Sequence, residues 1–151
     1  NLNDMGKDDI TFVVSMNKGQ AFTPLNETAS GGEISRLMLA IKTITMSKID
    51  INTLVFDEID TGVSGKVADA IGQKIHSIAL NNQVLCITHL PQVAIHADHH
   101  YAIKKQTQDE ETYSSLAVLN EDERIEEIAK MLSGDVITPE AIENAKRLLQ
   151  G

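Results

Sequence analysis

Apolar residues along the chain fall into two kinds of run, short continuous ones typical of strands and longer ones with helical spacing. The short runs cover Ile10 to Met16, Asn52 to Asp57 and Gln83 to His89. Helical spacing extends from about Gly32 to Ser47 and again from Gly65 to Leu80. Because the second and third short runs flank a helical one, the order predicts a βαβ crossover whose parallel strands are covered on both faces.

The remaining third of the chain predicts a hairpin and more helices. A short helix is expected after Pro91, since proline is well tolerated in a first helical turn. The runs His100 to Lys105 and Tyr113 to Leu119 flank the acidic stretch TQDEE, residues 107–111. They predict an antiparallel hairpin at one edge. Two helices, Glu121 to Leu132 and Thr138 to Leu149, close the chain. The expected fold class is α/β: a mostly parallel sheet flanked by helices, with an antiparallel edge hairpin and two C-terminal helices.

Composition narrows the class of protein. With 151 residues, 42% hydrophobic and 23% charged, residues 1–151 are expected to form one globular domain, and no apolar run is long enough to cross a bilayer. The net charge of −9 argues against general binding to phosphate backbones, so any DNA contact is expected elsewhere. The single cysteine, Cys86, lies in an apolar run and is expected to be a buried strand thiol, with no sign of a disulfide or of export.

The first candidate for chemistry is the stretch Ser30-Gly31-Gly32-Glu33, which precedes the first helical run. Ser30 can cap the helix, and the two glycines leave the first backbone N–H groups uncovered by any Cβ. A phosphate could therefore approach the positive end of the helix dipole. The alternative is a flexible cap in which Glu33 is simply favourable in the first turn.

Acidic and histidine side chains form the second candidate. Asp57 and Glu58 end one apolar strand, at the sheet edge where open α/β folds bind ligands. One carboxylate could hold Mg²⁺ and the other could orient water toward a phosphoryl group. His89 follows the next strand and is expected at the same edge. The alternatives are two solvated acids at a strand end and a structural histidine.

Three stretches in this order carry a family resemblance: ASGGEISRLMLAIK, VFDEIDTGVSGKVADAIG and ITHLPQVAIHADHHYAIKK, followed by ERIEEIAKMLSG. The chain resembles the C-terminal half of an ABC-type ATPase head, and most closely the SMC-like bacterial DNA repair ATPases of the RecN family. The resemblance extends from about Asp8 to Leu149. It implies a P-loop NTPase fold with ATP and Mg²⁺ as ligands.

The resemblance also implies a role for each matching residue. Residues 29–33 resemble the signature loop, in which Ser30, Gly31 and Gly32 contact the γ-phosphate of a nucleotide held by a facing head.

Asp57 resembles the Walker B aspartate that supports Mg²⁺, and Glu58 resembles the general base or water-positioning glutamate. Asp60 falls in the D-loop, which crosses the contact between heads, and His89 resembles the switch histidine.

Departures from related patterns sharpen the assignment. Ala29 replaces the leucine that is usual in transporters, and Ile59 replaces their proline after the acidic pair, which disfavours a transporter subunit. The D-loop sequence, IDTGVSG, is also unusual because it contains two glycines, Gly62 and Gly65.

A phosphate-cradling G-x-x-x-x-G-K-[S/T] loop does not occur in the sequence. The chain is therefore expected to be the C-terminal lobe of a head whose Walker A half and coiled coil belong to a longer polypeptide. That polypeptide would be a cytoplasmic, nucleoid-associated bacterial protein acting in double-strand break repair and recombination. Its expected partners are the Walker A half, a second head and DNA, with no membrane. An ABC transporter subunit and a dimerisation module without nucleotide remain the rivals.

Overall fold

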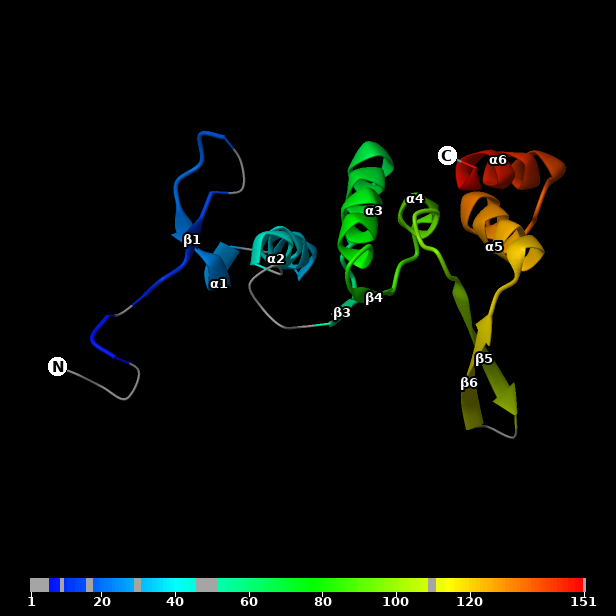
Figure 1. Ribbon diagram of the computed structural model, residues 1–151, viewed down its shortest axis with the longest axis horizontal. Helices are drawn as coiled ribbons and strands as arrows, with labels where there is room; N and C mark the ends of the chain where they lie inside the picture. Colours follow the sequence, from blue (N-terminus) through cyan, green and yellow to red (C-terminus); the bar gives the residue numbers. More distant parts are fainter. Residues whose placement is uncertain are drawn as a thin grey trace.

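A computed structural model describes residues 6–8, 10–15, 18–28, 31–45, 52–108 and 111–150. The predicted elements occur in the predicted order along the chain, and two short elements that were not predicted, β2 (Thr23–Pro24) and α1 (Leu25–Thr28), precede the first long helix (Figure 1). They are β1 (Val13–Val14), β2 (Thr23–Pro24), α1 (Leu25–Thr28), α2 (Gly31–Thr45), β3 (Thr53–Phe56), α3 (Gly65–Ala79), β4 (Gln83–Cys86), α4 (Pro91–Ala94), β5 (Tyr101–Gln108), β6 (Glu111–Val118), α5 (Glu121–Ser133) and α6 (Pro139–Leu149).

The predicted βαβ crossover is confirmed. Strands β3 and β4 are parallel, in a register that pairs Thr53 with Gln83 and Phe56 with Cys86, and α3 connects them. The Ile87 N–H donates to the Phe56 carbonyl at 2.9 Å, which extends the ladder one step past β4. His89, expected to end a strand, therefore lies in the segment between β4 and α4.

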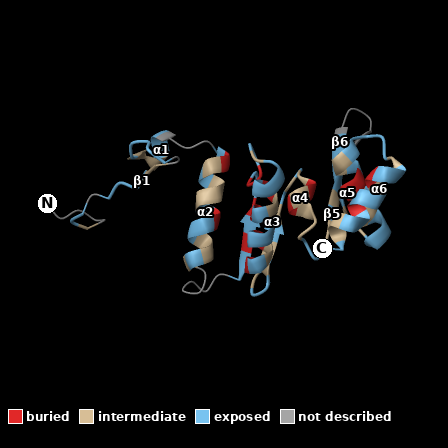
Figure 2. Cartoon of the chain, turned by 90° about the horizontal axis from the view of Figure 1, so that it is seen from above, coloured by how far each residue is buried: buried red, intermediate tan, exposed pale blue. Residues whose placement is uncertain are grey.

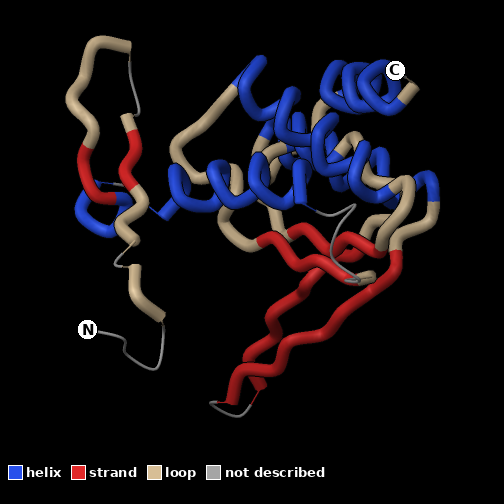
Figure 3. The backbone as a smooth tube through the Cα atoms, turned by 60° about the vertical axis from the view of Figure 1, so that its left-hand side comes forward, coloured by secondary structure: helices blue, strands red, loops and turns tan. Residues whose placement is uncertain are grey.

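Burial of the parallel pair differs from the prediction. Leu54 and Phe56 are buried, whereas Val55 between them is 63% exposed, and Leu85 and Ile87 are also exposed. The helices lie on one side of the pair, as Figure 3 shows. An apolar run predicts two covered faces, but within the described residues only one face is covered, so burial alternates along the strand.

The first strand is shorter than expected. The run Ile10 to Met16 contributes only Val13–Val14, which pairs antiparallel with Thr23–Pro24, and Met16 lies outside the described residues. A strand extends only as far as its backbone finds a partner, and this partner is two residues long. The two-stranded unit lies apart from α3 and α4, toward the N-terminal end of the molecule (Figure 1).

The predicted hairpin is confirmed, with β5 and β6 antiparallel from Tyr101 opposite Val118 to Gln108 opposite Glu111. It forms a two-stranded ladder of its own rather than extending the β3–β4 ladder. Figure 1 shows it projecting away from the helices. The acidic tip at residues 109–110 lies outside the description.

The described residues contain two hydrophobic cores. The first lies between α3 and the parallel strands, and the second between α5 and α6 (Figure 2). Helix α4 joins them, since Val93 is buried in the first core while Ala94 packs against the second.

Local signals fix both C-terminal helices. Asn120 and Glu123 form a capping box at the start of α5, and the Thr138 hydroxyl accepts from the Ala141 N–H at the start of α6. Both predicted helices are thereby confirmed. Among the described helices, none has the length and apolar character needed to cross a membrane.

Candidate functional site

The acidic pair follows β3 directly, as predicted. Asp57 and Glu58 are both exposed, and the chain then turns sharply. The Thr61 N–H donates to the Glu58 carbonyl at 3.2 Å, and the Val63 N–H donates to the Asp60 carbonyl at 3.3 Å. We call residues 57–63 the acidic turn. It presents two carboxylates to solvent at the carboxyl end of a parallel strand.

Glu58 has a strained backbone. Its φ of 55° makes it the one residue other than glycine with a positive φ in the described part of the chain. A left-handed conformation costs a residue with a Cβ about 1–2 kcal/mol. Such strain concentrates at functional sites, where the surrounding structure holds a side chain in a required direction.

The N-terminus of α2 packs against this turn. A Cβ placed on Gly32 would lie 2.6 Å from the Thr61 carbonyl oxygen, whereas one on Gly31 would meet nothing within 4 Å. Arg36 Nη1, one turn further along α2, donates to the same Thr61 oxygen at 3.0 Å. Gly32 is therefore required for the close approach of helix and turn, a role separate from the predicted access for phosphate.

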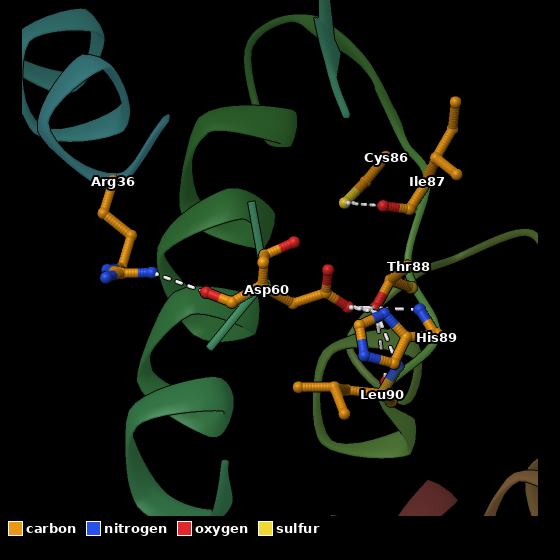
Figure 4. A network of polar contacts seen from close by, with 8 residues as sticks. Arg36, Asp60, Cys86, Ile87, Thr88, His89 and Leu90 are labelled. Atoms are coloured by element: carbon orange, nitrogen blue, oxygen red, sulfur yellow. Dashed lines mark hydrogen bonds and ion pairs between the residues drawn. The ribbon is translucent and has the colours of Figure 1, made fainter. Parts of the chain in front are cut away.

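Asp60 lies on the inner side of the turn. Its side chain is 1% exposed, and its Oδ2 accepts from the Thr88 hydroxyl and, at 3.1 Å, from the His89 N–H (Figure 4). His89 Nδ1 lies 3.4 Å from the same oxygen. The carboxylate thus faces its own chain, and the D-loop role predicted for Asp60 remains a prediction.

The structure therefore unites part of the predicted site. Asp60 contacts His89, and Gly32 contacts the acidic turn. In the described ranges His89 pairs with Asp60 and not with the side chain of Asp57 or Glu58. Glu33 is half-buried at the start of α2, and Ala29 and Ser30 lie outside the described residues.

Two residues of the network, Thr88 and Arg36, were not predicted from the sequence. Thr88 directly precedes His89, and its hydroxyl both donates to Asp60 and accepts from the Leu90 N–H at 3.1 Å. A threonine whose hydroxyl bonds two residues ahead is a common local turn, so the signal was present. Arg36 sits on α2 four residues after Gly32, but nothing local indicates a contact 25 residues away.

Burial, with a smaller effect of the acidic turn, raises the pKa of the Cys86 thiol. Burial raises the pKa of the thiol from 9.0 to about 11, and the negative charges of Asp60 and Asp57 add to the effect. Cys86 is half-buried at the end of β4, broadly as predicted, and is a free thiol. It is therefore a protonated, poorly nucleophilic group at neutral pH.

A cavity of about 850 Å³ lies away from the exposed acids. It is bounded by α3, β4, α4, α5 and the hairpin, and its lining includes His89 but neither Asp57 nor Glu58. The exposed carboxylates thus stand on an open surface rather than in a pocket.

Comparisons with known proteins identify the family. The chain is 46% identical over 149 residues to the DNA repair protein RecN of Bacillus subtilis (strain 168), covering 99% of this chain and 26% of the relative. It is 48% identical over 144 residues to RecN of Halalkalibacterium halodurans and 44% identical over 145 residues to RecN of Vibrio cholerae serotype O1. The chain belongs to the RecN family. It spans about a quarter of the length of these RecN relatives, and no family model matches it.

A solved structure supports the fold. It comes from work on ATP-driven dimerization and DNA stimulated activation of SMC ATPases, and it aligns with a TM-score of 0.53 at 19% identity, over 78% of this chain and 70% of its own. At that identity the similarity concerns the fold alone. The predicted α/β fold class, that of an SMC ATPase, is confirmed. The sheet predicted to be mostly parallel is represented among the described residues by one parallel pair, β3–β4, and the other two strand pairs are antiparallel.

Proposed function

We propose that the chain is the C-terminal lobe of an ATP-hydrolysing head in a RecN-type protein. The observation that carries the proposal is Glu58: a solvent-exposed acid in a strained left-handed conformation, directly after Asp57 at the end of a parallel strand. The chain is also similar to RecN proteins, which are named DNA repair proteins, and this supports placing it in a RecN-type protein.

The exposed acids fit a magnesium ion. No group of three or more metal-binding side chains occurs in the ranges that the structure describes. Mg²⁺ commonly takes one or two carboxylates and completes its shell with water and substrate phosphates, and Asp57 supplies such a carboxylate on an open surface. When bound, the ion neutralises charge on the transferred phosphoryl group.

The chain's own residues then divide the work. Asp57 would hold the metal, and Glu58 would accept a proton from, or orient, the attacking water. His89 would donate to a γ-phosphate oxygen where negative charge develops. Glu58 is the residue whose loss stops turnover while leaving nucleotide binding in place.

A second head completes the site in this proposal. Ser30, Gly31, Gly32 and Glu33 would contact ATP held by the Walker A loop of a facing head. Helix α2 supports this reading, since its 15 residues give it a full dipole and its first residue, Gly31, is exposed with open space around it. Hydrolysis would then require two heads together, each supplying half of the contacts.

The whole protein would work in double-strand break repair and recombination in the bacterial cytoplasm, at the nucleoid. DNA would be bound outside this acidic segment, whose net charge is −9. The Walker A half and the second head are the partners that the proposal requires.

The test is ATP turnover by the complete RecN-type protein with Glu58→Gln. We expect kcat to fall by about 10²–10⁴-fold, the usual contribution of a general base, while ATP affinity changes by less than about twofold. Glu126→Gln, on an exposed position of α5, is the matched control and should retain full turnover. Normal turnover by Glu58→Gln would refute the proposal.

One observation favours a second function. The uncovered apolar face at Val55, Leu85 and Ile87 is a surface on which two copies of the segment could associate without nucleotide. Under this alternative, Val55→Lys abolishes self-association of the segment, and Glu58→Gln leaves turnover by the complete protein unchanged.

A further inference from the structure

Asp60 is the one charged residue that is fully buried within the described part of the chain. Removing a carboxylate from water is costly, so such a group persists where donors satisfy its oxygens. Identifying those donors shows what the buried charge holds in place.

Among the described residues, the donors to the Asp60 side chain all come from one two-residue segment, Thr88-His89. The Thr88 hydroxyl and the His89 N–H both point at Oδ2, and His89 Nδ1 lies 3.4 Å from that oxygen. Figure 4 shows the carboxylate reaching across to this segment, with the His89 ring beside it. One oxygen thus meets both the backbone and the ring of the same histidine.

Thr88 tightens the arrangement. Its hydroxyl accepts from the Leu90 N–H at 3.1 Å while it donates to Asp60. The backbone on both sides of His89 is therefore tied to a single buried group, directly before α4 begins at Pro91.

The His89 ring is otherwise unsupported. Its side chain is 71% exposed, and Asp60 is the one side chain that pairs with it among the residues described. In the doubly protonated ring, which can donate to a phosphate through Nε2, the Nδ1–H faces the Asp60 carboxylate 3.4 Å away. This contact selects one orientation of a ring that packing alone leaves free. Without it, an exposed imidazole samples several rotamers.

The turn that carries Asp60 is itself anchored on its other side. The Thr61 carbonyl accepts from Arg36 of α2, and Gly32 packs against the same oxygen. These contacts fix the backbone that carries the Asp60 carboxylate. A side chain can orient another group only if its own position is fixed in this way.

We propose that Asp60 is a positioning residue that sets the direction of the His89 ring toward the reacting phosphate. The inference rests on the proposed function, since it assigns a purpose to His89 in that reaction. Asp60 touches neither nucleotide nor water in this scheme and acts entirely through Thr88 and His89.

A double-mutant cycle in the complete RecN-type protein tests the proposal. Asp60→Asn keeps the size of the side chain and is expected to lower kcat by about 10- to 100-fold, by analogy with residues that orient metal-binding histidines. The KM for Mg-ATP should change by less than about twofold, because the lost contribution belongs to the transition state. In a His89→Ala background, Asp60→Asn should cost nothing further, since the ring it positions is gone.

Asp69→Asn is the matched control. Asp69 Oδ1 pairs with His96 Nε2 at 2.7 Å, so this variant also breaks an Asp–His contact, but one outside the proposed site. Its kcat should equal that of the unmodified protein. Thr88→Val, which removes only the hydroxyl, serves if Asp60→Asn does not fold, and it should show the same loss of kcat and the same dependence on His89.

The outcomes separate the two proposals. Additive losses from Asp60→Asn and His89→Ala would overturn the positioning role, as would a crystal structure of Asp60→Asn with the His89 ring unmoved. If Glu58→Gln in the same assay retains full turnover, the proposed function fails instead. Loss of turnover in Glu58→Gln together with additive Asp60 and His89 effects would refute the positioning role alone.

Discussion

The strain at Glu58 can be measured directly by comparing alanine and glycine at that position. The φ of 55° costs any residue with a Cβ about 1–2 kcal/mol, which glycine does not pay. Relative to alanine, glycine lowers the free energy of unfolding by about 0.4–1 kcal/mol, because the unfolded chain has more conformational entropy. We therefore expect Glu58→Gly to be more stable than Glu58→Ala by about 0.5–1 kcal/mol, although neither variant retains the carboxylate.

Lys74 supplies the reference for this comparison. It is exposed in the middle of α3, where Lys74→Gly should be less stable than Lys74→Ala by about 1 kcal/mol. The order of stability should thus be opposite at the two positions when free energies of unfolding are measured in urea. If Glu58→Gly is less stable than Glu58→Ala by as much as the Lys74 pair, the strain argument is wrong.

Three further measurements test the structure. Gly32→Ala should lower the free energy of unfolding by about 1–3 kcal/mol, because its Cβ would press on the Thr61 carbonyl oxygen, whereas Gly31→Ala should be neutral or slightly stabilising; equal losses would contradict the packing described. Between pH 9 and 11 the folded chain should keep the Cys86 proton that the unfolded chain releases, so stability should fall as pH rises across this range; the fall should be smaller in Cys86→Ala, and identical pH profiles would rule out the raised pKa. Asn120→Ala should cost about 1 kcal/mol in thermal unfolding by removing the capping box of α5, while Asn120→Ser should retain most of it; no difference between these two would show that the cap contributes little.

The elements that the sequence predicts best are those whose signal is local. Helix α3 follows from apolar spacing near 3.6, and α6 begins at Thr138-Pro139, where the hydroxyl cap and the proline both favour a start. What local pattern could not supply is which face of a strand is covered. Phe56 and Val55 are both apolar, yet one is buried and the other exposed, since burial depends on what packs against each side.

The candidate site follows the same division. The location of Asp57 and Glu58 at the end of β3 was predicted, because it depends only on where the strand ends in the sequence. The inward direction of Asp60 was not, since it depends on Thr88, which is 28 residues away. The contact of Arg36 with Thr61 was missed for the same reason, as no periodicity within α2 marks which side chain reaches the turn.

Helix α4 has a consequence for how the chain unfolds. Four residues long, it places Val93 in the core of α3 and the parallel strands and Ala94 against the core of α5 and α6. Arg124 Nη2 of α5 also donates to the Ala97 carbonyl, just past the end of α4, at 2.6 Å. Opening of one core therefore removes support from the other through a single helical turn. When one core is destabilised or stabilised, the rates of amide hydrogen exchange in α3 and in α5 should therefore change in the same direction, because the two helices unfold as one cooperative unit.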